Sequence, residues 1–122
     1  MPTDLLRTET LAAKPSIVLP LLPLLLFVAP IAEETLFRGW LWQALRRQGM
    51  APVPTAAISA GLWLLLHAPS GMARLPTLLP LAVLLSIARH HGGVRSSLLL
   101  HVVNNAIVAA AIGLALLATG NK

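Results

Sequence analysis

Four long apolar runs dominate the sequence and restrict what the chain can fold into. They cover residues 16–32, 52–69, 75–88 and 96–118, and the first of them contains no charged residue. Charged residues make up 11% of the chain, less than half of the roughly 25% that is typical of soluble domains. So few charges cannot cover a water-facing globule. We therefore predict an all-α, polytopic transmembrane helical bundle with about four apolar spans.

The chain divides into a polar N-terminal segment, residues 1–15, and a single membrane core, residues 16–122. One helix over residues 16–47 would be roughly 48 Å long, which exceeds a hydrocarbon layer of about 30 Å. We expect the prolines to break it, with Pro30 starting a second helix that ends near Gly49. The third run is short for a full crossing, so it is predicted to be tilted or packed internally.

The net charge of +5 does not indicate nucleic-acid binding, because the basic residues stand singly or in pairs at the edges of the apolar runs. There they are typical of interfacial anchors in an integral, multi-pass membrane protein embedded in a lipid bilayer. Four spans place four basic residues on each side, which leaves the orientation open. The absence of cysteine excludes thiol chemistry and zinc fingers.

Glu33, Glu34 and Arg38 form the pattern EExxxR next to an apolar run. On a helix, Glu34 and Arg38 are one turn apart in the favourable order for an ion pair. Glu33 is rotated by about 100° from Glu34, so it cannot share that contact equally. The pattern predicts one neutralised carboxylate and one carboxylate left to act as a general base on water. The alternative is that both acids only cap a helix start after Pro30.

The second and fourth runs each contribute one further polar cluster. His67 ends the second run, with Trp63 one turn earlier, and Asn105 lies one turn after His101 in the fourth. Taken singly, His67 is typical of an interfacial residue, and the His101 and Asn105 pair is typical of hydrogen bonding between helices. Taken together, the clusters predict a polar active site buried between helices, because ionisable groups within spans are costly unless they face one another.

Two kinds of chemistry fit this set of side chains. Glu33, His67, His101 and Asn105 can activate a water and stabilise an oxyanion without a cofactor. Glu33, His67 and His101 can also ligate a metal, with zinc as the expected ion. The contiguous HExxH motif of zinc proteases is absent, so any metal site must be assembled across helices. The sequence leaves the choice between no cofactor and zinc undecided.

The three clusters resemble the motifs of the CPBP intramembrane proteases, which include type II CAAX prenyl endopeptidases and bacteriocin-processing or abortive-infection-like membrane proteases. Those motifs are EExxxR, FxxxH and HxxxN, and they correspond here to residues 33–38, 63–67 and 101–105, with similar flanking sequences. The resemblance covers roughly residues 26–110. It implies an integral protein of a prokaryotic cell membrane that cleaves peptides.

The resemblance also implies a role for each motif residue. Glu33 becomes the water-activating base, Glu34 and Arg38 a structural pair, and His67, His101 and Asn105 the rest of the site. Trp63 stands where the family has phenylalanine, which changes packing beside His67 without removing chemistry. The chain has fewer helices than the family commonly has. A second copy or a membrane partner is therefore expected to complete the cavity.

Three functions compete on the sequence. The leading one is a membrane-embedded endopeptidase that hydrolyses a peptide bond of a peptide or protein substrate near the membrane surface with a glutamate-activated water. The alternative is a catalytically silent binding or immunity protein of the same fold that sequesters a peptide or partner. A channel is disfavoured because the polar residues do not recur along one helix face. Retention of the whole motif set favours the enzyme.

Overall fold

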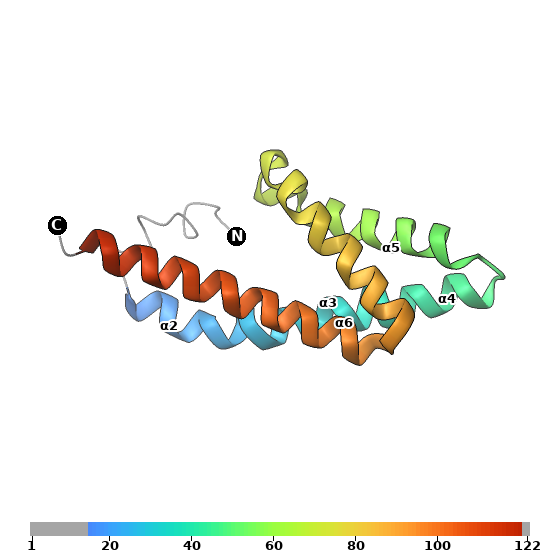
Figure 1. The fold of residues 1–122 in the computed structure, drawn as a ribbon, viewed down its shortest axis with the longest axis horizontal. Helices are drawn as coiled ribbons and strands as arrows, with labels where there is room; N and C mark the ends of the chain where they lie inside the picture. The colour runs from blue at the N-terminus through green and yellow to red at the C-terminus, as the bar shows by residue number, and fades with distance from the viewer. Residues whose placement is uncertain (1–14, 121–122) are drawn as a thin grey trace.

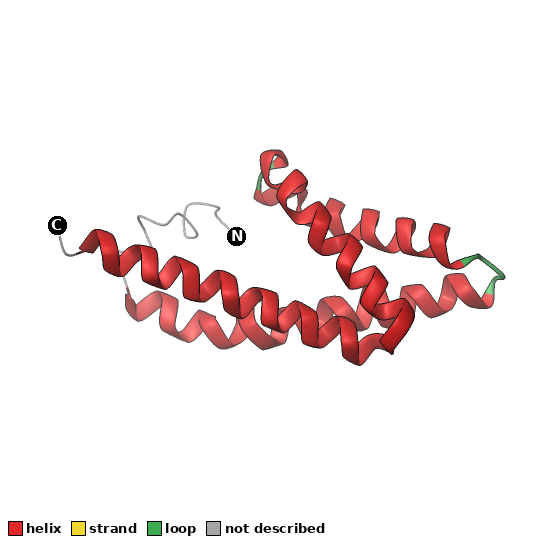
Figure 2. Ribbon diagram, viewed as in Figure 1, coloured by secondary structure: helices red, strands yellow, loops and turns green. Residues whose placement is uncertain are grey.

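The computed structural model describes residues 15–120, and regular structure within that range is entirely helical, as Figure 2 shows. The predicted all-α class is therefore confirmed for the described part of the chain. The predicted polar segment, residues 1–15, lies outside it apart from Pro15, the first residue of α2.

The first half of the chain forms one uninterrupted helix with alternating α-helical and π-helical segments. These are α2 (Pro15–Pro23), η2 (Leu24–Val28), α3 (Ala29–Glu34), η3 (Thr35–Leu41) and α4 (Trp42–Arg47). Backbone angles at the junctions remain right-handed helical throughout.

The expectation that the prolines break this helix is wrong. A proline lacks an N–H and its ring crowds the carbonyl four residues earlier, which normally kinks a helix. Here the helix widens before Pro30, and the Ala29 N–H donates to the Leu24 carbonyl five residues back. The π-helical register of η2 accommodates the proline without ending the helix.

Gly49 ends the helix, as predicted. Its φ is 85°, a conformation that glycine adopts without strain. The Gly49 N–H donates to the Arg46 carbonyl and the Met50 N–H to the Leu45 carbonyl, which is the hydrogen-bond pattern of a Schellman cap. Helix α5 (Pro52–His67) then begins after the extended residue Ala51, with Pro52 in its first turn.

Two short 3₁₀ turns, η4 (Ala68–Ser70) and η5 (Met72–Arg74), lead into α6 (Leu75–Gly120). Gly93 has φ 77° and ψ −173°, angles that are not helical, and α6 changes direction there. Figure 1 shows the second half of α6 running back alongside α2. The third and fourth apolar runs are thus joined by a sharp bend at one glycine.

Two helices are long and apolar enough to cross a membrane: Leu19–Arg47 and Met72–Thr119. The expectation of about four spans is not confirmed, because α5 has 16 residues and α6 contains both the third and the fourth apolar run. Many large apolar side chains on these helices are exposed, among them Leu99 and Ile107. An apolar exterior of this kind suits contact with lipid.

A small core lies where the long N-terminal helix meets α5 and the first half of α6. Phe37, Trp63 and Ala82 are buried together, and the partly buried residues packed around them are Leu41, Ala60, Leu64, Leu78 and Leu81. Each of these three helices contributes one central residue. The core therefore fixes η3 against α5 and holds the glutamate motif close to Trp63.

Candidate active site

Glu34 and Arg38 form the ion pair that their spacing predicts. The Arg38 Nη1 donates to Glu34 Oε1 at 3.2 Å, and both side chains are 0% exposed. Glu34 ends α3 and Arg38 lies in η3, so the pair spans the boundary between the two segments. The pair is buried in the bundle and does not cap a helix start at the membrane surface.

Glu34 has a second partner that the sequence did not indicate. Its Oε1 lies 2.8 Å from Nδ1 of His101, a residue of α6 that is 3% exposed. An ionised carboxylate only accepts hydrogen bonds, so Nδ1 of His101 carries the proton. The ion pair therefore fixes the orientation of the His101 ring and, in the neutral form, leaves its Nε2 unprotonated.

Glu33 occupies a different environment from its neighbour. Its side chain is 20% exposed, and its Oε2 accepts a hydrogen bond of 2.5 Å from the indole Nε1 of Trp63. Trp63 is 1% exposed, so this donor is held rigidly in the core. The phenylalanine of the resembled motif could not make this bond, and Trp63 therefore adds a polar contact as well as a change of size.

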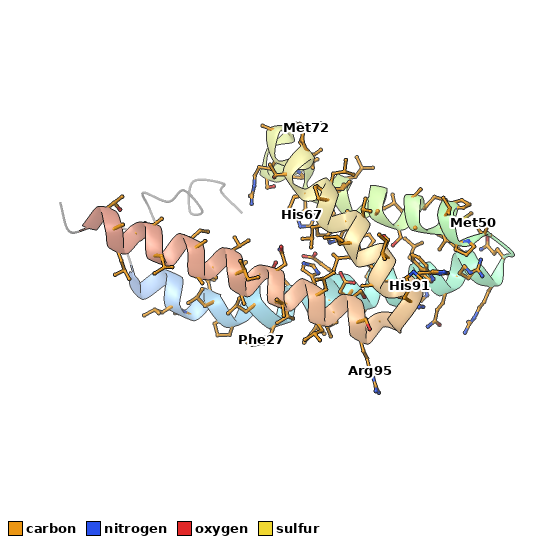
Figure 3. All side chains as sticks on the ribbon, in the orientation of Figure 1. Phe27, Met50, His67, Met72, His91 and Arg95 are labelled. Carbon is orange, nitrogen blue, oxygen red and sulfur yellow. The ribbon has the colours of Figure 1, made fainter. Side chains whose placement is uncertain are left out.

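Both histidines direct Nε2 towards Glu33. The Nε2 of His67 lies 3.9 Å from Glu33 Oε2, and the Nε2 of His101 lies 3.8 Å from the same oxygen. The Nδ1 of His67 lies 2.8 Å from the Trp63 carbonyl, which is an acceptor, so Nδ1 carries the proton here too. Figure 3 shows His67 at the C-terminal end of α5.

The structure does not bring Asn105 into hydrogen-bonding contact with Glu33, His67 or His101. Its Nδ2 donates to the Leu25 carbonyl in η2 at 3.0 Å. In the π-helical register that carbonyl would pair with residue 30, which is a proline without an N–H. Asn105 thus satisfies the backbone acceptor that Pro30 leaves unpaired and ties the fourth apolar run to the first.

Two further side chains hold the carbonyl groups of η3. Ser59, which is fully buried in α5, donates to the Phe37 carbonyl at 3.0 Å, and Arg89 of α6 donates through Nε to the Arg38 carbonyl at 2.5 Å. A π-helical segment leaves carbonyls less well aligned with their own helix, and such segments are frequent at functional sites. Neither role could be predicted from the sequence, because the partners of Ser59 and Arg89 are backbone atoms on another helix.

The donor types of Glu33, His67 and His101 match those of a zinc site, since zinc binds unprotonated imidazole nitrogens and carboxylates. Their arrangement does not. Within residues 15–120, no group of three or more histidine, aspartate or glutamate side chains is placed so that it could hold one metal ion.

The chain matches the type II CAAX prenyl endopeptidase Rce1-like family over residues 15–107. No curated protein and no solved structure matches it. The matched region contains all three polar clusters, including the buried ion pair and both histidines that face Glu33. The chain therefore belongs to the Rce1-like family of type II CAAX prenyl endopeptidases, which are membrane-embedded proteases.

Proposed function

We propose that the protein is a membrane-embedded endopeptidase that hydrolyses a peptide bond near the membrane surface with a water activated by Glu33. The observation that carries the proposal is the convergence of Glu33 Oε2 with the Nε2 atoms of His67 and His101, at 3.9 and 3.8 Å. These separations are too long for direct hydrogen bonds. We place a water about 2.8 Å from Glu33 Oε2 and from one of the two Nε2 atoms, so that it bridges the carboxylate and that histidine.

Glu33 is the proton acceptor in this mechanism. The Trp63 indole holds its Oε2, and the partial exposure of the side chain gives water and substrate access. Glu33 takes a proton from the water as the oxygen attacks the carbonyl carbon of the scissile bond. The same proton then passes to the nitrogen of the leaving amine when the carbon–nitrogen bond breaks.

The two histidines complete the site through hydrogen bonds to the water and to the oxyanion. A water has two hydrogens and cannot donate to a carboxylate and two unprotonated imidazoles at once. We assign one histidine to the oxyanion of the tetrahedral intermediate, which it stabilises as a hydrogen-bond donor in the reacting state. We assign this role to His67, which is more exposed than His101 and therefore more accessible to an incoming substrate.

Glu34 and Arg38 are positioning residues, because Glu34 holds Nδ1 of His101 and Arg38 holds Glu34. Asn105 keeps one amide hydrogen after its bond to Leu25, and its place in the site rests on the family resemblance. A peptide or protein in the bilayer is the substrate. A second copy of the chain or a membrane partner supplies the remaining walls of the substrate channel.

Cleavage of a membrane-peptide library by the purified protein in detergent tests the proposal. Glu33→Gln keeps the shape of the side chain but cannot accept the water's proton, so we expect hydrolysis to be abolished. Trp40→Phe is the matched control, because Trp40 lies in the same helix and is 68% exposed. Cleavage by Glu33→Gln at the wild-type rate would contradict the role of Glu33. Tight peptide binding without cleavage by the wild type would identify a binding protein instead.

A further inference from the structure

A hollow of about 410 Å³ lies at the C-terminal end of α4, and the catalytic residues play no part in it. The hollow is shallow and open, and it lies at the surface of the bundle. The side chains that line it come from α4 and from the first half of α6, and they are Trp42, Gln43, Arg46, Arg47 and Arg89. Three of the five are arginines.

These arginines have no carboxylate partner within the described part of the chain. The only acidic residues between positions 15 and 120 are Glu33 and Glu34, and both are engaged in the catalytic cluster. Three positive charges around one open hollow repel one another. A carboxylate or other anion that pairs with them must therefore come from outside residues 15–120.

Arg89 is held in a fixed position at this hollow. Its Nε donates to the Arg38 carbonyl, and its guanidinium carbon lies 5.4 Å from the centre of the Trp42 ring. Arg46 is also held, because its Nη1 donates to the Met50 carbonyl at 2.6 Å. Arginines fixed in this way present their remaining N–H groups at little further cost in side-chain entropy.

The position of the hollow, at the end of a candidate membrane span, favours the membrane surface as the source of an anion. Arg46 and Arg47 end the candidate span Leu19–Arg47, and Gln43 and both arginines are exposed. Arginines at the end of a span lie at headgroup depth, and planar guanidinium groups bind phosphate oxygens in pairs. Figure 3 shows Met50 in the loop beside this end of the helix, whereas Arg95 points away from the bundle.

We propose that this hollow binds the phosphate of one anionic phospholipid headgroup, with Arg46, Arg47 and Arg89 as phosphate ligands and Trp42 as the wall on which Arg89 is stacked. The site is independent of the proposed peptidase activity. Isolated interfacial arginines attract anionic lipid loosely, whereas this set is drawn from two helices, with Arg89 held against the Trp42 indole, and retains a single lipid.

Native mass spectrometry of the full chain in detergent tests the proposal, with phosphatidylglycerol and phosphatidylcholine as probes. We expect one phosphatidylglycerol retained per chain and little phosphatidylcholine. Arg46→Gln with Arg47→Gln should weaken phosphatidylglycerol binding by about 25-fold, taking a factor of about five for each basic residue. Arg95→Gln, which removes one exposed charge outside the hollow, is the matched control and should change binding by less than about twofold.

Several outcomes would overturn the assignment. Equal retention of both lipids, or undiminished phosphatidylglycerol binding by the double variant, would show that the arginines do not form a phosphate site. An equal loss in Arg95→Gln would indicate general charge attraction. Glycerol 3-phosphate is the third probe: if it binds as tightly as phosphatidylglycerol, the ligand is a soluble phosphate compound and not a lipid. Circular dichroism confirms that each variant is folded.

Discussion

Replacing Glu34 by glutamine separates the two adjacent glutamates by their effect on stability. The change keeps the shape of the side chain and removes its charge. Arg38, which is 0% exposed, then has no counter-charge at hydrogen-bonding distance, and His101 loses the ionised acceptor at its Nδ1. We therefore expect Glu34→Gln to lower the free energy of unfolding, whereas Glu33→Gln should leave it nearly unchanged.

The expected magnitude follows from the burial of the pair. Removing one partner of a buried ion pair costs about 3 to 5 kcal/mol. Three atoms of this pair, Glu34 Oε2 and Arg38 Nε and Nη2, have no hydrogen-bond partner among the described residues, which reduces what the intact pair contributes. We therefore expect a loss of about 3 kcal/mol for Glu34→Gln, near the lower limit of that range. Arg38→Gln should cost a similar amount.

The double variant decides whether the two residues act as a pair. Denaturant titration in detergent, analysed as a double-mutant cycle, should give a double-variant cost smaller than the sum of the single costs by about 0.5 to 3 kcal/mol. This follows because the double variant buries no uncompensated charge. Additivity of the single costs to within about 0.5 kcal/mol would refute the pair. A stability loss in Glu33→Gln equal to that in Glu34→Gln would refute the distinction between the glutamates.

Three further changes test the site and the fold. Trp63→Phe removes the N–H that orients Glu33, a hydrogen bond worth about 1.5 kcal/mol to a charged acceptor. We therefore expect kcat to fall by about tenfold in steady-state peptide cleavage. An unchanged kcat would show that the bond is dispensable. Gly93→Ala places a side chain on a backbone with φ 77° and ψ −173°, and we expect it to lower the free energy of unfolding by about 1 to 3 kcal/mol. The measurement is a lower melting temperature than in the control Gly113→Ala, whose position has open space for a methyl group. Elemental analysis should find no stoichiometric zinc, and zinc that is lost together with activity in His101→Ala would overturn the metal-free mechanism.

The parts of the site that could be predicted from the sequence are those set by local geometry. The Glu34–Arg38 pair follows from a spacing of four residues on a helix, and the burial of polar clusters follows from the cost of exposing them to lipid. The helix end at Gly49 follows from the conformational freedom of glycine. None of these inferences requires knowing which helices are neighbours.

The rest depends on contacts between helices, which spacing alone does not encode. The bond from Trp63 to Glu33 and the bond between His101 and Glu34 join positions 30 and 67 residues apart. The prediction that the prolines break the first helix was wrong for the same reason. Asn105, on a distant part of the chain, pairs with the carbonyl that Pro30 leaves free, so the helix continues where local rules predict a break.

The π-helical segment η3 also sets the rotation of α4 about the helix axis relative to the glutamates that precede η3. Each residue advances an α-helix by about 100°, and a π-helical turn accommodates an extra residue without breaking the helix. Glu33 and Glu34 precede η3, whereas Trp42 and the arginines of α4 follow it. Deleting one residue within η3 would therefore turn the basic end of the helix by about 100° relative to the glutamates. The widened turn is what allows one continuous helix to direct its carboxylates towards α5 and α6 and, independently, its arginines towards the hollow beside Arg89.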